Sequence, residues 1–191
     1  MKLHERLPDC VVVDGKRYRM DFDFRNVLRM IEILESNNLM PEAKAYNALH
    51  CVCKRPKNVF KVLGAVKALL FTGSRKTGPK VTDFAQDAGL IRAAFRQAYG
   101  IDLYRDKLHW FEFQELMGAL PNDTRYSEVV GIRAKPVPAP TKFNQHEREW
   151  LMRTKADVAL EMTEDEQKAQ YQQDVGQLAA FLLGIDRKSV V

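Results

Sequence analysis

The sequence predicts a mostly α-helical protein with a β-hairpin near its N-terminus. Apolar residues recur at the three- and four-residue spacing of helices along most of the chain. One Asp-Gly turn signal lies between two short β-rich runs near the start. Prolines, capping residues and glycines mark the expected starts and ends of helices in the rest of the chain. We expect a helical core domain over residues 1–133, a proline-rich connector over 134–141 and a helical arm over 142–191.

The hairpin and the first helix come from the N-terminal part of the core domain. Asp14 and Gly15 separate runs over 10–13 and 16–20, and both residue types tolerate the positive φ of a type I′ turn. An isolated hairpin is marginally stable, so we expect it to pack on helices. Asp23 is the expected cap of a helix over 24–34. Five of its apolar residues lie on one helical face: Phe24, Val27, Leu28, Ile31 and Leu34.

Two prolines predict the starts of the next two helices. Pro41 suits the first turn of a helix that runs to about Cys53, and Pro56 suits the first turn of another. The second of these helices has apolar residues at helical spacing, from Val59 to Leu70. The segment over 71–80, FTGSRKTGPK, is rich in glycine and basic residues and is expected to be a mobile loop.

Capping signals predict a fourth and a fifth helix. Asp83 with Gln86 resembles a capping box, and Gly100 is the expected C-terminal stop of the helix that follows. A fifth helix is expected over 108–120. Pro121 and Asn122 break it.

The remaining helices begin near residue 123. Asp123 is the expected cap of a sixth helix that runs to about Arg133. Three prolines within 134–141 predict an extended connector. Beyond it we expect helices over 144–160 and 163–183, the latter opened by a capping box of Thr163 and Glu166.

The sequence offers no recognisable catalytic or metal-binding motif. It contains no phosphate-binding loop, nucleophile elbow or zinc-protease signature. His50, Cys51 and Cys53 lie close together, but their spacing does not match a zinc knuckle, so we favour neutral free thiols. Asp102 and Asp106 could form a carboxylate pair, although capping is the stronger interpretation at a helix start. We therefore expect a protein that is not an enzyme and uses no cofactor or metal.

No apolar run reaches the roughly 18 residues that span a bilayer. The first ten residues also lack the apolar core of a secretory signal. We therefore expect no membrane partner, and we expect the protein to remain in the cytoplasm in which it is made.

Charge is distributed unevenly along a chain of net charge +5. Residues 51–80 contain eight basic and no acidic residues, whereas 157–174 contain six acidic residues and one lysine. Three interpretations remain open: two solvated faces, nucleic-acid binding by the basic stretch, or contact between the basic lobe and an acidic helix of a neighbouring copy. The first is favoured because charge asymmetry alone rarely identifies a partner.

The order of motifs over about residues 10–135 resembles a family of siphophage proteins known as gene product fifteen. The resemblance is carried by VVVDGKRYRMDFDFRNVLRM, by DFAQDAGLIRAAFRQAYGIDL and by LHWFEFQELMGALPNDTRYSEVVGIR. After Pro140 the resemblance is limited to Lys142 and Asn144, which fit a lysine-rich helix start, and the rest of the chain diverges. The resemblance implies a tail assembly chaperone of a phage or prophage that keeps the tape-measure protein soluble, helps to recruit tail tube protein and is absent from the mature virion. A paired chaperone is another implied partner. From the acidic, capped helix of the arm we also expect the chain to associate with further copies of itself.

Two apolar groups are candidate partner-binding surfaces, because amphipathic clients dock in apolar grooves between helices. The first comprises Trp110, Phe113 and Met117, and the second comprises Leu178, Phe181 and Leu182. Either group could instead belong to the core. Two rival functions remain: a nucleic-acid-binding or packaging accessory protein that uses the basic residues over 54–80, and a minor structural component of the tail.

Overall fold

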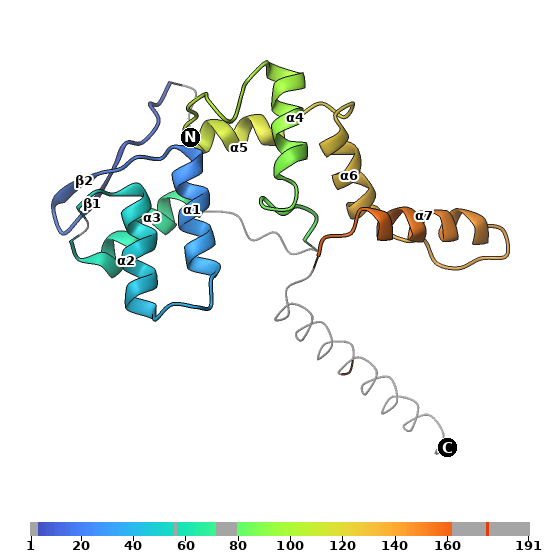
Figure 1. Ribbon diagram of the computed structural model, residues 1–191, viewed down its shortest axis with the longest axis horizontal. Coiled ribbons are helices and arrows are strands. Elements are labelled where there is room, and N and C mark those ends of the chain that lie inside the picture. Colours follow the sequence, from blue (N-terminus) through green and yellow to red (C-terminus); the bar gives the residue numbers. More distant parts are fainter. Residues whose placement is uncertain (1–3, 56, 72–79, 162–174, 176–191) are drawn as a thin grey trace. The chain divides into compact units, whose positions relative to one another are not determined.

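The computed structural model describes residues 4–55, 57–71, 80–161 and 175. The predicted fold class is confirmed: the described chain is mostly helical and carries an N-terminal antiparallel hairpin (Figure 1). The chain divides into two compact units, Met1–Pro136 and Val137–Val191. The first contains β1 (Cys10–Val13), β2 (Lys16–Arg19), α1 (Phe24–Glu35), α2 (Pro41–Val52), α3 (Val59–Phe71), α4 (Ala88–Tyr99), α5 (Trp110–Gly118) and α6 (Arg125–Ala134), and the second contains α7 (Gln145–Asp157).

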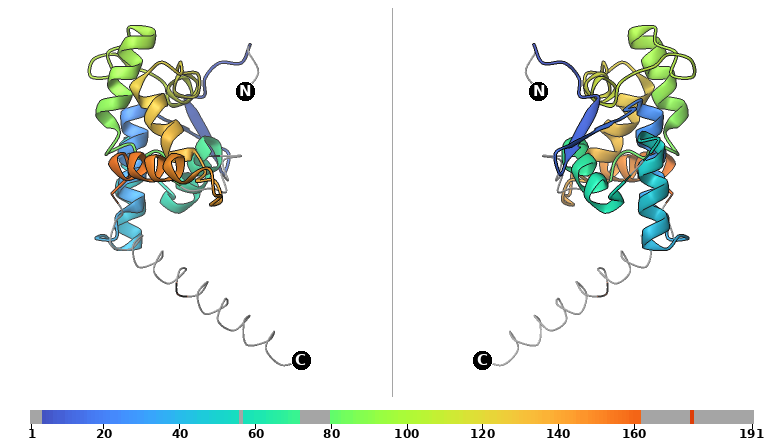
Figure 2. Two further views of the ribbon diagram at one scale, coloured as in Figure 1. Left: turned by 90° about the vertical axis from the view of Figure 1, so that its right-hand side faces the viewer. Right: turned by 90° about the vertical axis from the view of Figure 1, so that its left-hand side faces the viewer.

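The hairpin turns at the predicted dipeptide. Asp14 and Gly15 have φ values of 50° and 73°, the left-handed conformation that a type I′ turn requires at both positions. β1 and β2 pair in antiparallel register, with Val11 opposite Tyr18. The hairpin also packs on a helix, as expected, because β1 lies against α3 (Figure 2).

Several helix boundaries form where the sequence predicts them. The Arg25 amide donates to the Asp23 carboxylate over 3.0 Å, so Asp23 caps α1. Pro41 occupies the first turn of α2. Gly100 follows α4 with a φ of 69°, the left-handed conformation typical of a glycine C-terminal stop.

The predicted start of α3 is wrong. The helix begins at Val59, because Asn58 has a φ of 50° and the chain therefore leaves the right-handed helical conformation just before it. Pro56, and residues 72–79 of the predicted loop, lie outside the described residues.

The predicted capping box at Asp83 is correct in part. The Asp83 carboxylate accepts hydrogen bonds from the amides of Ala85 and Gln86, each over 2.9 Å. The reciprocal bond comes from Asp87 and not from Gln86, since the Asp83 amide donates to the Asp87 carboxylate over 2.9 Å. Residues 84–87 consequently form a turn, and α4 begins only at Ala88.

Three other predicted boundaries shift. α5 begins at Trp110, capped by the His109 ring, which accepts from the Phe111 amide over 3.3 Å. Thr124, and not Asp123, caps α6 by accepting from the Ser127 amide over 3.2 Å. α7 is shorter than the predicted 144–160 helix. The predicted helix over 163–183 lies outside the described residues except at Val175.

The starts of α1 and α5 are tied together by backbone hydrogen bonds. The Phe24 amide donates to the Leu108 carbonyl over 3.0 Å, and the Trp110 amide donates to the Phe22 carbonyl over 2.8 Å. The Arg25 guanidinium adds bonds to the carbonyls of Leu103 and Asp106, at 2.9 and 2.7 Å. These bonds join segments about 80 residues apart and fix the loop after α4 beside the start of α1.

Candidate binding surface

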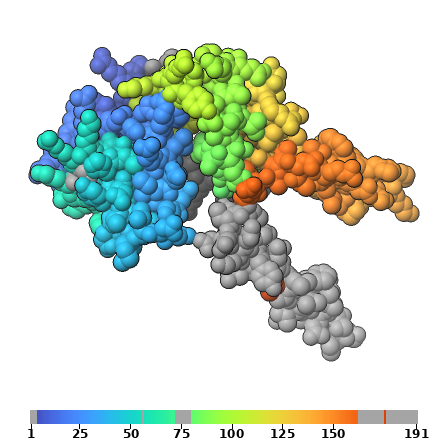
Figure 3. Space-filling view, in the orientation of Figure 1, coloured from blue at the N-terminus to red at the C-terminus, as the bar shows by residue number. Residues whose placement is uncertain are grey.

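An open groove with an apolar floor lies between α1 and residues 80–92. Its volume is about 790 Å³. The blue surface of α1 and the green surface of the segment that leads into α4 form its two walls in Figure 3. Six apolar side chains line it: Phe24, Leu28, Ile31, Phe84, Ala88 and Ile91. Ala85, Leu103, Tyr104 and Phe113 complete its apolar lining.

Phe84, like Tyr104, is an exposed aromatic residue of the groove. Its side chain is 39% exposed, whereas Phe24 and Ile91 are buried. The ring lies over the core aromatics, with its centroid 6.2 Å from that of Phe113 and 6.4 Å from that of Trp110. Capping by Asp83 fixes the turn that carries Phe84, so both the backbone and the ring are held in place. An apolar ligand can therefore cover Phe84 without reordering it, which lowers the entropic cost of binding.

Along the rim that α1 contributes, the charged side chains change from basic to acidic toward the C-terminal end of the helix. Arg25 and Arg29 precede Glu32 and Glu35, and all four line the groove. Arg25 contacts Asp23 at 3.2 Å, so its charge is compensated. Arg29, Glu32 and Glu35 are exposed, and within the part of the chain that the structure describes, no side-chain hydrogen bond or ion pair reaches any of them.

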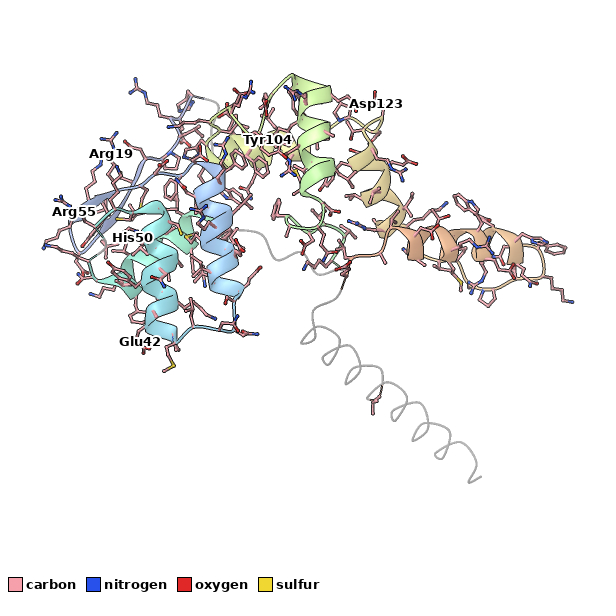
Figure 4. All side chains as sticks on the ribbon, viewed as in Figure 1. Arg19, Glu42, His50, Arg55, Tyr104 and Asp123 are labelled. Atoms are coloured by element: carbon pink, nitrogen blue, oxygen red, sulfur yellow. The ribbon has the colours of Figure 1, made fainter. Side chains whose placement is uncertain are left out.

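The opposite rim is held by its own contacts. Lys80 and Asp83 form an ion pair at 3.0 Å. The Gln86 amide is the main cause that lowers the pKa of Asp83, and the Lys80 side chain and the Ala85 amide act in the same direction. The Arg92 guanidinium lies 4.7 Å from the ring centre of Tyr104, a cation–π contact. Tyr104 is labelled in Figure 4, in the loop between α4 and α5.

The structure places the first predicted binding group mostly in the core. Trp110 is 2% exposed and Phe113 is 1% exposed, and Phe113 stacks on Phe24 with ring centres 4.8 Å apart. Met117 is partly buried and packs against the same core. Trp110 and Phe113 therefore lie in the core, and Phe113 also lines the groove from within. Leu178, Phe181 and Leu182 lie outside the described residues.

The aromatic residues that the structure shows as exposed are not among the predicted binding residues. Phe84 and Tyr104 border the groove, and Tyr104 is 72% exposed. In the second unit, Phe143 is 98% exposed and Trp150 is 59% exposed. The local sequence holds no signal that separates Phe84 from a core aromatic, because Phe24 also follows a capping aspartate, Asp23, and is buried.

The basic stretch over 51–80 is partly neutralised. Lys61 pairs with Asp14 at 2.9 Å, and Lys80 pairs with Asp83. Lys54, Arg55 and Lys57 are exposed. Arg75 and Lys76 lie outside the described residues.

The histidine and the cysteine of α2 lie at a shallow polar depression. His50 and Cys51, on α2, line a cavity of about 450 Å³ with Asn26 and Arg29 of α1; Figure 4 labels His50. Cys10, Cys51 and Cys53 are free thiols, and burial raises the pKa of Cys51. In the described residues no group of three potential ligands gathers to hold a metal ion. No described helix is long and apolar enough to cross a membrane.

Asp102 and Asp106 organise a turn, as the capping interpretation predicts. The Asp102 amide donates to the Asp106 carboxylate over 2.7 Å, and the Tyr104 amide donates to the Asp102 carboxylate over 3.0 Å. Arg96 also contacts Asp102 at 3.3 Å. Both carboxylates thus support the loop that carries Tyr104 to the edge of the groove.

Comparison with known proteins gives one family. The sequence model of the family described as Bacteriophage Gp15 protein matches residues 3–72 and 57–160. No curated protein and no solved structure matches the chain. The family match spans both groove walls, from Phe24 to Ile91.

Proposed function

The chain belongs to the bacteriophage Gp15 protein family, and from this premise we propose that it is a tail assembly chaperone. In this role it binds the tape-measure protein, keeps it soluble in the host cytoplasm and helps to recruit tail tube subunits. It then leaves, so the mature virion does not contain it. A paired chaperone and further copies of this chain would take part in the same assembly.

The groove between α1 and residues 80–92 supports this proposal. A tape-measure protein is a long helical polypeptide with extensive apolar surface, so a chaperone needs sites that cover one face of a helix. An apolar floor between charged rims is the usual form of such a site. α1 spans 12 residues and is therefore about 18 Å long, enough to cover about three turns of a client helix.

Weak binding by each copy suits a chaperone that must be released. One copy covers only a few turns of the client, so many copies along one long polypeptide supply the avidity that keeps it soluble. Tube subunits can then displace the copies one at a time as the tube grows.

The test is co-expression of the full-length protein with a long segment of the tape-measure protein from the same phage. We expect the segment to become soluble and to co-purify with this chain. Phe84→Ser should reduce the recovered segment at least about tenfold, because exposed aromatic anchors dominate such contacts. Phe60→Ser is the matched control, since Phe60 is 62% exposed on α3 and lies outside the groove lining.

Two other outcomes would contradict the proposal and favour the rival functions. If the segment stays insoluble while the protein binds DNA with an affinity that falls steeply with salt, the basic stretch carries the function. If mass spectrometry finds the protein in purified virions at a fixed stoichiometry, it is a structural component of the tail.

A further inference from the structure

A cluster of exposed cations lies where the hairpin meets the end of α2. The Asp21 amide, just after β2, donates to the Val52 carbonyl at the end of α2 over 2.8 Å. Beyond α2 the chain leads to Lys61 of α3, which pairs with Asp14 in the hairpin turn at 2.9 Å. The segment between α2 and α3 is therefore tied to the hairpin at both ends. Its described residues, 53–55, 57 and 58, are held beside the hairpin.

Four cations on these segments form what we call the basic surface: Arg19 of β2 and Lys54, Arg55 and Lys57 of the segment after α2. All four are exposed, and among the described residues none of them makes a side-chain hydrogen bond or an ion pair. Arg19 and Arg55 are labelled in Figure 4, on the same side of the first unit. Because unpaired cations that lie close together repel one another, a ligand with several negative charges is favoured there.

The carboxylates of the hairpin do not neutralise the basic surface. Asp9 pairs with Arg17 at 3.0 Å, and Asp14 pairs with Lys61. Asp21 is exposed and can offset one of the four charges. The basic surface therefore keeps an excess of positive charge.

The chain itself contains a stretch of the opposite charge. Residues 157–174 include six acidic residues and one lysine, and Glu164, Asp165 and Glu166 are consecutive. Three consecutive residues span at most about 11 Å, a length that suits a compact group of cations. Residues 162–174 lie outside the described residues.

We propose that the acidic stretch over 157–174 of one copy binds the basic surface of a second copy. Each copy then offers a different surface to each of two neighbours, so the contact can repeat around a ring or along a filament. Nucleic acid fits less well, because the carboxylates of Asp9, Asp14 and Asp21 interrupt the track that a phosphate backbone would follow. The inference goes beyond the proposed function, since it assigns the surfaces by which copies of this chain associate.

The test is the mass of the full-length protein in solution, measured by light scattering over a series of protein concentrations. At about 0.05 M NaCl we expect assemblies larger than one chain. At about 0.5 M NaCl the apparent dissociation constant should be at least about tenfold higher, because salt screens exposed charge pairs.

The basic-surface variant Lys54→Glu/Arg55→Glu should remain a single chain at protein concentrations where the wild type assembles. Lys107→Glu/Arg153→Glu is the matched control. It makes the same change in net charge at an exposed lysine and an exposed arginine outside the basic surface, and it should assemble like the wild type. Circular dichroism first verifies that each variant keeps the helix content of the wild type.

The acidic-stretch variant Glu164→Lys/Asp165→Lys should also remain a single chain. A combined variant that carries this pair of changes together with Lys54→Glu/Arg55→Glu has opposite charges at both surfaces, and we expect it to assemble again. Restored assembly would identify the two surfaces as partners, because the two pairs of changes would then not be independent.

A wild-type protein that remains a single chain at every concentration would overturn the inference. Loss of assembly in the control variant, or a combined variant that does not reassemble, would do the same. If the wild type remains a single chain but binds duplex DNA, and Lys54→Glu/Arg55→Glu abolishes that binding, the basic surface serves nucleic acid instead.

The co-expression test of the proposed function has a separate outcome. A tape-measure segment that becomes soluble beside a protein that remains a single chain removes the inference alone. A segment that stays insoluble, although the combined variant reassembles, removes the proposed function alone.

Discussion

Arg133, in the last turn of α6, forms a buried ion pair with Asp87, directly before α4. The Arg133 guanidinium lies 2.8 and 3.0 Å from the two carboxylate oxygens, and the side chains are 11% and 2% exposed. Arg133 also donates to the Val81 carbonyl over 3.1 Å. Because Asp87 accepts the Asp83 amide as well, this pair connects α6 to the turn that carries Phe84.

Replacing Arg133 with methionine should lower the free energy of unfolding by about 3–5 kcal/mol, because the Asp87 carboxylate would remain buried without its counter-ion. Urea denaturation followed by circular dichroism measures the change. Arg125→Met is the control, since Arg125 pairs with Glu128 in an exposed pair and should cost at most about 1 kcal/mol. Similar losses in the two variants would contradict a structural role for the buried pair.

Phe113→Ala should cost about 3–5 kcal/mol, because the ring stacks on both Phe24 and Phe95, at 4.8 and 5.3 Å between centres. Met117→Ala should cost less, about 1 kcal/mol, because Met117 is only partly buried. Thermal and urea unfolding give both values. A Phe113→Ala protein that keeps wild-type stability but loses the tape-measure client would restore Phe113 as a contact residue.

Asp83→Ala should destabilise the protein by about 1 kcal/mol at pH 7, through loss of the cap. The amide of Gln86 is the chief cause that lowers the pKa of Asp83 below its ordinary value of 3.8. A carboxyl whose pKa is lower in the folded state adds stability above the unfolded pKa of about 3.9, and this contribution disappears as the pH falls through the folded value.

The difference between wild type and Asp83→Ala should therefore be constant from about pH 7 to pH 5 and shrink below about pH 4. Unfolding free energies across this range measure it. A difference for Asp83→Ala that stays constant down to pH 2 would mean that the ionised carboxylate is not the stabilising form.

Thr124→Ala should cost about 1–2 kcal/mol, because Thr124 is 1% exposed and its hydroxyl both accepts from the Ser127 amide and donates to the Pro121 carbonyl. Asp123→Ala should change stability by less than about 0.5 kcal/mol. Parallel thermal melts of the two variants compare them directly. A larger loss of stability in Asp123→Ala than in Thr124→Ala would mean that Asp123 is the cap of α6.

Gly100→Ala should destabilise the protein by about 1 kcal/mol, since its φ of 69° is unfavourable for a residue with a Cβ. Gly64→Ala is the matched control. Gly64 lies within α3, where an added Cβ meets no atom within 4 Å, so alanine should stabilise the helix by about 0.5–1 kcal/mol. The melting temperature should fall in Gly100→Ala and rise in Gly64→Ala. If it moved in the same direction in both variants, the left-handed φ of Gly100 would not explain the effect.

Local signals predicted much of the fold because each depends on a few neighbouring residues. Asp14 and Gly15 specify the hairpin turn, Asp23 caps α1 and Gly100 ends α4, each through its own backbone conformation or side-chain reach. Prediction was less accurate where two neighbouring residues could each cap the same helix. Asp123 and Thr124 are both good caps, and Thr124 caps because its buried hydroxyl also reaches the Pro121 carbonyl.

The candidate site could not be predicted in the same way. Trp110 and Phe113 were conspicuous in the sequence, but they support the groove from within the core. The exposed aromatic that lies over both rings is Phe84, which comes from a segment more than 20 residues earlier. Helical spacing places an apolar residue on a face. It does not say whether another element covers that face.

By itself, the sequence determined the helical class, the hairpin, several caps and the phage family, because periodicity, turn chemistry and motif order are properties of neighbouring residues. The tertiary structure alone decided that α1 faces residues 80–92 across an apolar groove and that Arg29, Glu32 and Glu35 line one rim. Long-range contacts, such as the bonds from Arg25 to the loop after α4, bring these segments together, and local sequence patterns do not encode such contacts.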